Sequence, residues 1–294
     1  MNNIKKIGLT ALAGSLVATS VAYAGELTAT GAASVEMQNN SQSAAGKTVT
    51  MGNSVNFAGS GETDGGLNVS LAFELDQGAS DGAAGVYDNH SVSVGNDTLG
   101  TVTVHGHGGT NSASALDTTA AGDLWDNGLG ITAGNDPDAA ASGNGLVVWS
   151  LPSVVDSLSL GASYASDGEN NAGSMAYGAV YTGIEGLTLS FGRGSDDTAA
   201  ATDADQTIMK LSYAYGPVTV GYSNNDYDHT TANSDQEVKS FSLAYTLTDA
   251  ISVSYGEETI EKTGTSSDIE TEGMTASYTS GGMTVGVTAI EATN

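Results

Sequence analysis

The chain has 294 residues, with 34 acidic and 7 basic side chains, a formal net charge of -27 and no cysteine. Such an acid excess argues against a nucleic-acid-binding protein, which needs a basic surface to displace counterions from phosphates. The lack of Cys excludes disulfide scaffolds, thiolate metal sites and cysteine nucleophiles. With 40 Gly and only 14% charged residues, the chain is poor in helix-favouring residues, which disfavours an ordinary helical or α/β enzyme.

The first 24 residues have the pattern of a secretory signal peptide. Lys5 and Lys6 form a basic start, Ile7 to Val21 is mainly small and apolar, and Ala22-Tyr23-Ala24 matches an A-x-A cleavage site. A membrane anchor is the alternative, but about 15 apolar residues are few for a bilayer span. We therefore expect cleavage after Ala24, with the first 24 residues helical and outside the fold of the mature chain.

From Leu67 to Asp76, apolar and polar residues alternate, which is typical of a strand with one apolar and one polar face. The same alternation recurs at 158–164, 175–181, 187–191, 211–215, 218–222, 241–247, 251–255, 274–278 and 285–287. Weaker examples are Leu27 to Met37, Val49 to Gly59, Val86 to Val94, Thr101 to His107 and Val147 to Leu151. Together these segments predict fifteen strands.

Short and long connections alternate along the chain. The short ones are rich in turn formers and lie at 62–66, 95–100, 152–156, 182–186, 216–217, 248–249 and 280–282. The long ones are 38–47, 77–85, 108–144, 166–173, 194–205, 224–236 and 257–268. This order predicts short turns at one end of the sheet and long loops at the other.

Strands of about eight to eleven residues suit a bilayer crossing, and short turns opposite long loops are typical of membrane barrels. Because lipid cannot satisfy backbone N–H and C=O groups, a sheet exists there only when it closes on itself. The predicted fold class is all-β, a transmembrane antiparallel β-barrel. A soluble β-sandwich is the alternative, although it gives no reason for the two loop classes to separate.

Four segments then carry a family resemblance. Asn56 to Leu67, Ser91 to Val104, Leu158 to Tyr164 and Tyr215 to Val220 resemble strand–turn–strand units of general Gram-negative outer-membrane porins, and the likeness spans the mature chain. The resemblance implies a channel for passive diffusion of small hydrophilic solutes, located in the cell outer membrane. It also implies a homotrimer in contact with outer-membrane lipid and lipopolysaccharide. Gly108 to Asn144 falls where the family has its pore-constricting third loop.

The chain departs from the family in two ways. Barrels of this type have even strand numbers, so 16 strands are expected, yet the sequence ends after the fifteenth, at Asn294. We expect a missing C-terminal strand, and a gap or a distorted seam between Thr284 to Ile290 and Leu27 to Met37. The family's cluster of wall arginines is also absent, since the basic residues after the signal are Lys47, Arg193, Lys210, Lys239 and Lys262.

The loop candidate contains five acids and no basic residue: Asp117, Asp123, Asp126, Asp136 and Asp138. Folded inward, as the resemblance implies, these would form a negative ring at the constriction, and such rings favour cations. The alternative for each Asp is simple solvation. Further lumen-facing candidates are Glu74, Asp76, His105, His107 and Lys210.

No cofactor is predicted. His105 and His107 share a strand face but lack an identifiable third metal ligand. Asp196-Asp197 and Asp226-Tyr227-Asp228 suit at most weak divalent cations that bridge to lipopolysaccharide, because the spaced pattern of a dedicated calcium loop is missing.

No catalytic residue is predicted either. Gly78 to Gly82 spells Gly-x-Ser-x-Gly, but no helix pattern follows to expose a nucleophile. A non-enzymatic channel is therefore favoured over an outer-membrane lipase barrel. The alternative function from another class is a secreted, acidic, β-rich adhesin or surface-layer protein, against which the lack of a fixed short repeat argues.

Overall fold

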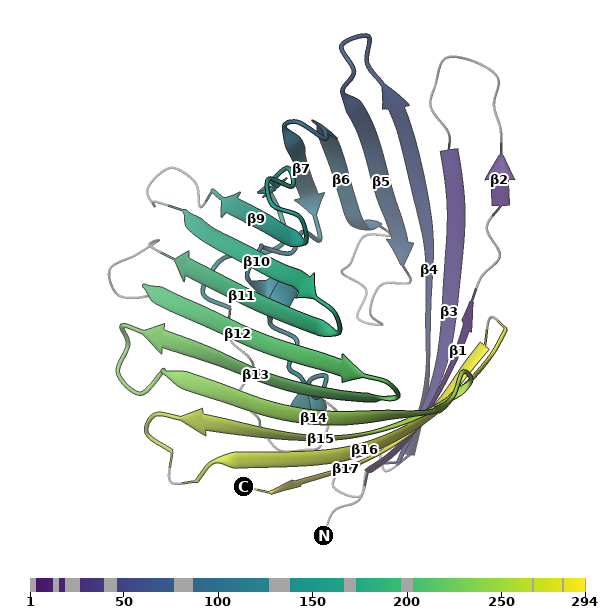
Figure 1. The fold of residues 1–294 in the computed structure, drawn as a ribbon, viewed down its shortest axis with the longest axis vertical. Coiled ribbons are helices and arrows are strands. Elements are labelled where there is room, and N and C mark those ends of the chain that lie inside the picture. The colour runs from purple at the N-terminus through teal and green to yellow at the C-terminus, as the bar shows by residue number, and fades with distance from the viewer. Residues whose placement is uncertain are drawn as a thin grey trace.

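The computed structural model describes residues 4–12, 16–18, 27–39, 47–76, 87–126, 138–166, 173–196, 203–265, 267–281 and 283–293. These form one antiparallel sheet of seventeen strands, which curls around a central space (Figure 1). The first nine are β1 (Ile4–Leu12), β2 (Leu16–Ala18), β3 (Leu27–Asn39), β4 (Lys47–Glu62), β5 (Asn68–Asp76), β6 (Tyr87–Asn96), β7 (Gly100–His107), β8 (Leu146–Ser150) and β9 (Leu158–Ala165). The others are β10 (Ser174–Ile184), β11 (Leu187–Asp196), β12 (Ala204–Tyr215), β13 (Val218–His229), β14 (Gln236–Thr248), β15 (Ile251–Lys262), β16 (Ile269–Ser280) and β17 (Met283–Thr293).

From β3 to β17, every strand pairs with the next one along the chain. These fifteen strands coincide with the fifteen alternating segments, which confirms the predicted antiparallel all-β fold. Two short 3-10 helices, η1 (Ser114–Leu116) and η2 (Leu124–Asp126), lie between β7 and β8. No helix in the described ranges is long and apolar enough to cross a membrane.

Glycine sets the tightest turns. In the β10–β11 hairpin, Gly186 has a φ of 76°, a backbone conformation that side chains with a Cβ rarely adopt. A Cβ at this position would also lie 2.2 Å from the carbonyl oxygen of Ala214 on β12. A neighbouring strand therefore passes the turn at a distance that only glycine permits.

The two faces of the sheet differ as the alternation predicts. On β14, Phe241, Leu243 and Tyr245 are 43%, 42% and 45% exposed, and the residues between them, Ser242 and Ala244, belong to the opposite face. A β-sandwich would bury the apolar face against a second sheet. Here that face is uncovered, as in a barrel that meets lipid on its outside and water on its inside.

The junction between the first and last barrel strands differs in part from the expectation. β3 and β17 do not pair with each other, because β1 lies between them, with Ile7 opposite Val287 on one side and Met37 on the other. β2 pairs with the start of β3. The lack of direct pairing between β3 and β17 agrees with the expected distorted seam. The helical placement of the N-terminal segment is wrong for residues 4–12 and 16–18, which are strands. Unpaired strand edges accept any strand-competent segment, which is the physical reason for this arrangement. Cleavage after Ala24 stays a prediction, and it would remove β1 from the junction.

The buried apolar side chains lie on the polar face of the sheet, where the segment between β7 and β8 covers it. Val238, Ile260 and Ile269 cluster there on β14, β15 and β16, with Trp125 packed against them. A second cluster joins Ala113, Ala140, Ala176 and Ile208, and a third joins Leu124 and Ile290. The compact core is thus formed by one loop and the inner wall of the barrel.

The assignment of faces is testable with a matched pair on β14. Leu243→Arg places a charge on the apolar face and should lower the free energy of unfolding by roughly 2–4 kcal/mol, if Leu243 lies near the bilayer midplane. Ala244→Arg, on the water-facing side, should change it far less. Denaturant titration of refolded protein in lipid vesicles measures both. Equal losses would contradict the assigned faces.

Candidate functional site

The long segment between β7 and β8, here called the inner loop, lies against the polar face of the sheet. Its two described limbs, residues 108–126 and 138–145, meet at Gly109 and Gly143, whose backbones exchange N–H···O bonds of 3.1 and 2.6 Å. η1 packs on β11, and η2 packs on β15 and β16 (Figure 1). The loop therefore turns inward and follows the barrel wall.

Serine side chains of the wall hold the backbone of the inner loop. Each accepts a hydrogen bond from a loop N–H, which satisfies backbone groups that would otherwise be buried without a partner. The four pairs are Ser112 with Ser163 at 2.9 Å, Ala120 with Ser223 at 2.8 Å, Ala121 with Ser240 at 2.9 Å and Ala141 with Ser174 at 2.8 Å. The four acceptors come from four different strands, so the loop is tied down along its length.

A buried carboxylate fixes the far end of the loop. Glu258 on β15 is 2% exposed and accepts hydrogen bonds from the hydroxyl of Thr119 and from the backbone N–H of Trp125, the latter at 3.0 Å. Hydrogen bonds to charged groups contribute about 1.5–3 kcal/mol each, more than neutral ones. The sequence analysis missed Glu258, because the alternation places its side chain on the water-facing side but does not show that the loop covers it.

Wall glycines let the loop lie directly on the sheet. A Cβ at Gly256 would be 2.5 Å from the Cβ of Ala121, and one at Gly178 would be 2.5 Å from the carbonyl oxygen of Ser112. Such distances are too short for real contacts, so a larger residue at either position would lift the loop. The close fit explains why the loop stays along the wall.

Four of the five predicted constriction acids lie in the described part of the inner loop. The hydroxyl of Ser114 donates to Asp138 at 2.6 Å, and the backbone N–H of Thr119 donates to Asp123 at 2.9 Å. Partial burial and then the carboxylates of Asp138 and Asp123 raise the pKa of Asp117 to about 7. Asp126 ends η2, and Asp136 lies outside the described residues.

Lys210 on β12 faces the same loop, and its Nζ donates to the carbonyl oxygen of Thr118. Glu74 on β5 accepts a hydrogen bond of 3.4 Å from Asn56 on β4, and Asp76 ends β5 opposite Ser54. Asp117, Asp123 and Lys210 are thus brought together, whereas Glu74 and Asp76 belong to a different part of the wall.

The two histidines are also separated from the loop acids. His105 lies under the start of the loop, since a Cβ at Gly109 would be 2.7 Å from the His105 Cβ, and its Nδ1 has no hydrogen-bond partner among the described residues. His107 pairs with His90 beside a β-bulge. Within the described ranges, no group of three or more His, Asp or Glu is placed to hold a metal ion.

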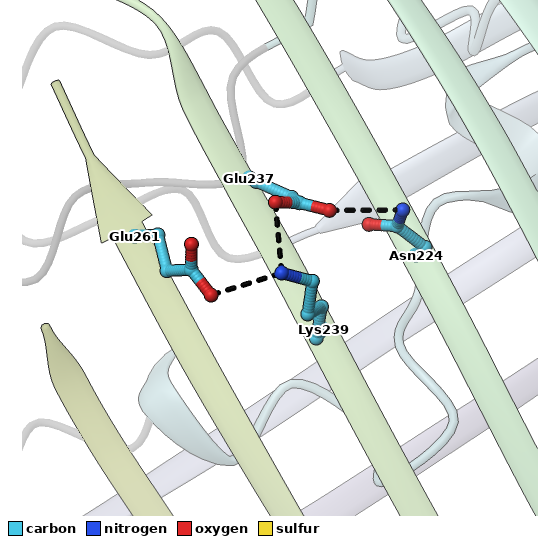
Figure 2. Close-up of polar contacts among 4 residues, drawn as sticks. All are labelled: Asn224, Glu237, Lys239 and Glu261. Carbon is cyan, nitrogen blue, oxygen red and sulfur yellow. Dashed lines mark hydrogen bonds and ion pairs between the residues drawn. The ribbon is translucent and has the colours of Figure 1, made fainter.

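On the apolar face, charged residues extend the strands at the loop end of the sheet. Figure 2 shows Lys239 on β14 between Glu237 of the same strand and Glu261 of β15, at 2.9 Å from each. Glu237 also accepts a hydrogen bond of 3.1 Å from Asn224 on β13. These residues share a face with Phe241, so the outer surface of β14 changes from apolar to charged along the strand.

Comparisons with known proteins bear on the whole chain. The sequence model of the Gram-negative porin family matches residues 8–293. The fold is similar to an anion-selective porin from Comamonas acidovorans, with 12% identity, a TM-score of 0.62 and full coverage of both chains. It is also similar to a mutant form of Rh. blastica porin, with 15% identity, a TM-score of 0.60 and 99% coverage of each chain. Salmonella typhi OmpF in complex with daunomycin is a third similar structure, with 10% identity, a TM-score of 0.58, and 100% and 97% coverage. No curated protein sequence matches the chain.

The Glu258 contact generates a prediction about loop mobility. Glu258→Ala removes the acceptor for Thr119 and Trp125, so amide hydrogen exchange in residues 119–126 should become about 10- to 100-fold faster. Glu257→Ala is the matched control, because the Glu257 side chain lies on the opposite face of the sheet from Glu258. Hydrogen-exchange mass spectrometry in detergent micelles measures both. Similar protection in the two variants would show that the loop does not depend on Glu258.

The raised pKa of Asp117 generates a prediction about pH. Asp117 is neutral below about pH 7 and negative above it, so any preference for cations should increase as the pH rises through 7. Asp117→Asn should remove this step, whereas Asp97→Asn, in the turn between β6 and β7, should keep it. Reversal potentials from pH 5.5 to 8.5 test this. A step that persists in Asp117→Asn would assign the titration to another group.

Proposed function

We propose that this chain, which belongs to the Gram-negative porin family, is an outer-membrane channel through which small hydrophilic solutes diffuse passively. The observation that carries the proposal is the inner loop, held by wall serines and Glu258 on the water-facing side of a barrel whose other face is apolar. A barrel of about 16 strands leaves an aqueous channel, and a loop along its wall narrows that channel without filling it. Passage through it requires no bond to be made or broken, so no enzymatic step enters the proposal.

We further propose that the channel prefers cations. Asp117, Asp123 and Asp138 lie together on the inner loop, and the nearby Lys210 is bonded to the loop backbone. Rings of acidic side chains favour cations. The porin from Comamonas acidovorans is anion-selective, but at 12% identity the likeness between the two chains shows the fold alone.

A homotrimer is proposed from the family and from the outer face of β3. Ala29, Gly31 and Ala33 form a stretch of small side chains on that face, which lets a second copy of the chain approach closely. Lipid covers the remainder of the apolar face in this proposal. An adhesin or surface-layer protein needs neither feature and is set aside.

Lipopolysaccharide is the proposed partner of the charged outer rim. Glu237, Lys239 and Glu261 lie where the apolar face ends, at the loop side of the sheet. Carboxylates at this level would meet lipid phosphates through Ca²⁺ or Mg²⁺, both of which prefer oxygen ligands. Exposed ion pairs such as these stabilise the fold by at most about 1 kcal/mol, which leaves them free for such contacts.

The selectivity proposal is tested by the reversal potential across a tenfold KCl gradient. Wild-type protein should prefer K⁺, more strongly at low salt, because the Debye length shrinks from about 10 Å at 0.1 M to about 3 Å at 1 M. Replacing the five acids of the inner loop by their amides should reduce the preference most at low salt. Those five are Asp117, Asp123, Asp126, Asp136 and Asp138.

A control variant replaces five acids of the short turns by their amides, which removes the same charge far from the loop. These are Asp64, Asp97, Asp156, Glu185 and Asp249. The control should keep most of the wild-type preference. Anion preference in the wild type would refute the selectivity proposal, and equal effects of the two variants would place the selectivity elsewhere on the wall.

A further inference from the structure

A cavity of about 420 Å³ lies between the first limb of the inner loop and the wall formed by β8, β9 and β10. It reaches the turn between β8 and β9, and thus lies toward the turn end of the barrel. None of its lining residues is charged. In a chain with 34 acids, an uncharged cavity beside an acidic loop is an unusual local environment.

The lining combines an apolar side with a polar side. Leu116 of the loop, Val148 of β8 and Val180 of β10 contribute apolar surface, although Val148 and Val180 lie on the face of the sheet that is otherwise polar. Ser159 contributes a hydroxyl, whereas the Asn111 amide is fully buried and already bonded within the loop. Apolar side chains are unusual on the water-facing wall of a barrel. Their exposure to water is unfavourable, and an apolar contact would remove that cost.

Ser112 supplies an independent indication of a ligand. It lines the cavity, is 8% exposed, and its Oγ has no hydrogen-bond partner in the described part of the chain. The Oγ lies over Gly161, another lining residue, where an added Cβ would be 3.3 Å away. A buried hydroxyl without a partner costs free energy, and a ligand group that bonds to it would remove that cost.

We infer that this cavity is a binding subsite for small uncharged solutes that join a hydroxylated end to a short aliphatic segment. The aliphatic segment packs on Leu116, Val148 and Val180, and the hydroxylated end bonds to Ser112 and Ser159. Charged solutes are disfavoured because the lining offers no countercharge. The inference rests on the proposed channel and adds solute retention to free diffusion.

The wall provides a matched pair of variants. Val180 is paired with Ser159 on β9 and with Ser190 on β11, so both serines lie on the same face of the sheet, one on each side of it. Ser159 lines the cavity, whereas Ser190 does not. Ser159→Phe should therefore fill the cavity, and Ser190→Phe adds the same bulk to the lumen beside it.

The experiment measures current noise from single channels in a planar bilayer while propyl β-glucoside or glucose is added to both sides. We expect propyl β-glucoside to produce saturable noise, with a half-saturating concentration at least tenfold below that of glucose. Ser159→Phe should raise that concentration tenfold or more, and Ser190→Phe should leave it within twofold. Ser112→Ala should raise it about threefold to tenfold, the loss of one neutral hydrogen bond, while its backbone bond to Ser163 persists.

Equal half-saturation for the two sugars, or equal effects of the two Phe variants, would overturn the inference. If Ser159→Phe does not fold, as judged by the absence of conducting channels, Ser112→Ala carries the test alone, and an unchanged half-saturation in it would be contrary to the inference. A wild-type chain that forms no channel would refute the proposed function instead, so the two failures are distinguishable.

Discussion

The constraint on which the structure depends is the pairing of backbone polar groups where no water can satisfy them. In lipid, each unpaired N–H or C=O group costs several kcal/mol, so every strand needs two neighbours. From β3 to β17, each strand pairs with its neighbours along the chain. This leaves one edge of β3 and one edge of β17 without a partner from that series. The position of β1 between those edges follows from the same requirement.

The requirement applies again inside the barrel, at the inner loop. A loop pressed on a wall loses water from its own N–H groups, and here wall serines and Glu258 take the place of that water. Serine side chains are short, so they can bond to the N–H groups of the loop while the loop backbone lies close to the wall. The wall glycines have no side chain that would hold the loop backbone away. Wall composition therefore sets how far the loop stands off the wall, and with it the width of the channel.

The sequence predicts the strands and their faces well, because lipid on one side and water on the other impose a strict period of two. It does not predict which inward side chains lie under the loop, since Ser223 or Glu258 has the same parity as any water-facing residue. One usable signal exists: Ile208, Val238 and Ile260 are apolar at water-facing positions, and all three are buried near the loop. The strand at the N-terminus is not predicted, because the composition of that segment indicates a signal for export. Composition does not show that an unpaired strand edge is available to that segment.

The division of the wall has a consequence for solutes. The anchors of the inner loop lie on β9 to β15, so the opposite wall, β3 to β5, borders the open side of the channel. That wall presents Ser54, Asn56 and Glu74 across the lumen from the acids of the loop. In the proposed channel, carboxylates on both sides would give a weak transverse field and a negative mean potential. Such a channel would sort ions by sign more than it orients polar molecules, and uncharged solutes would be distinguished by contact with the wall.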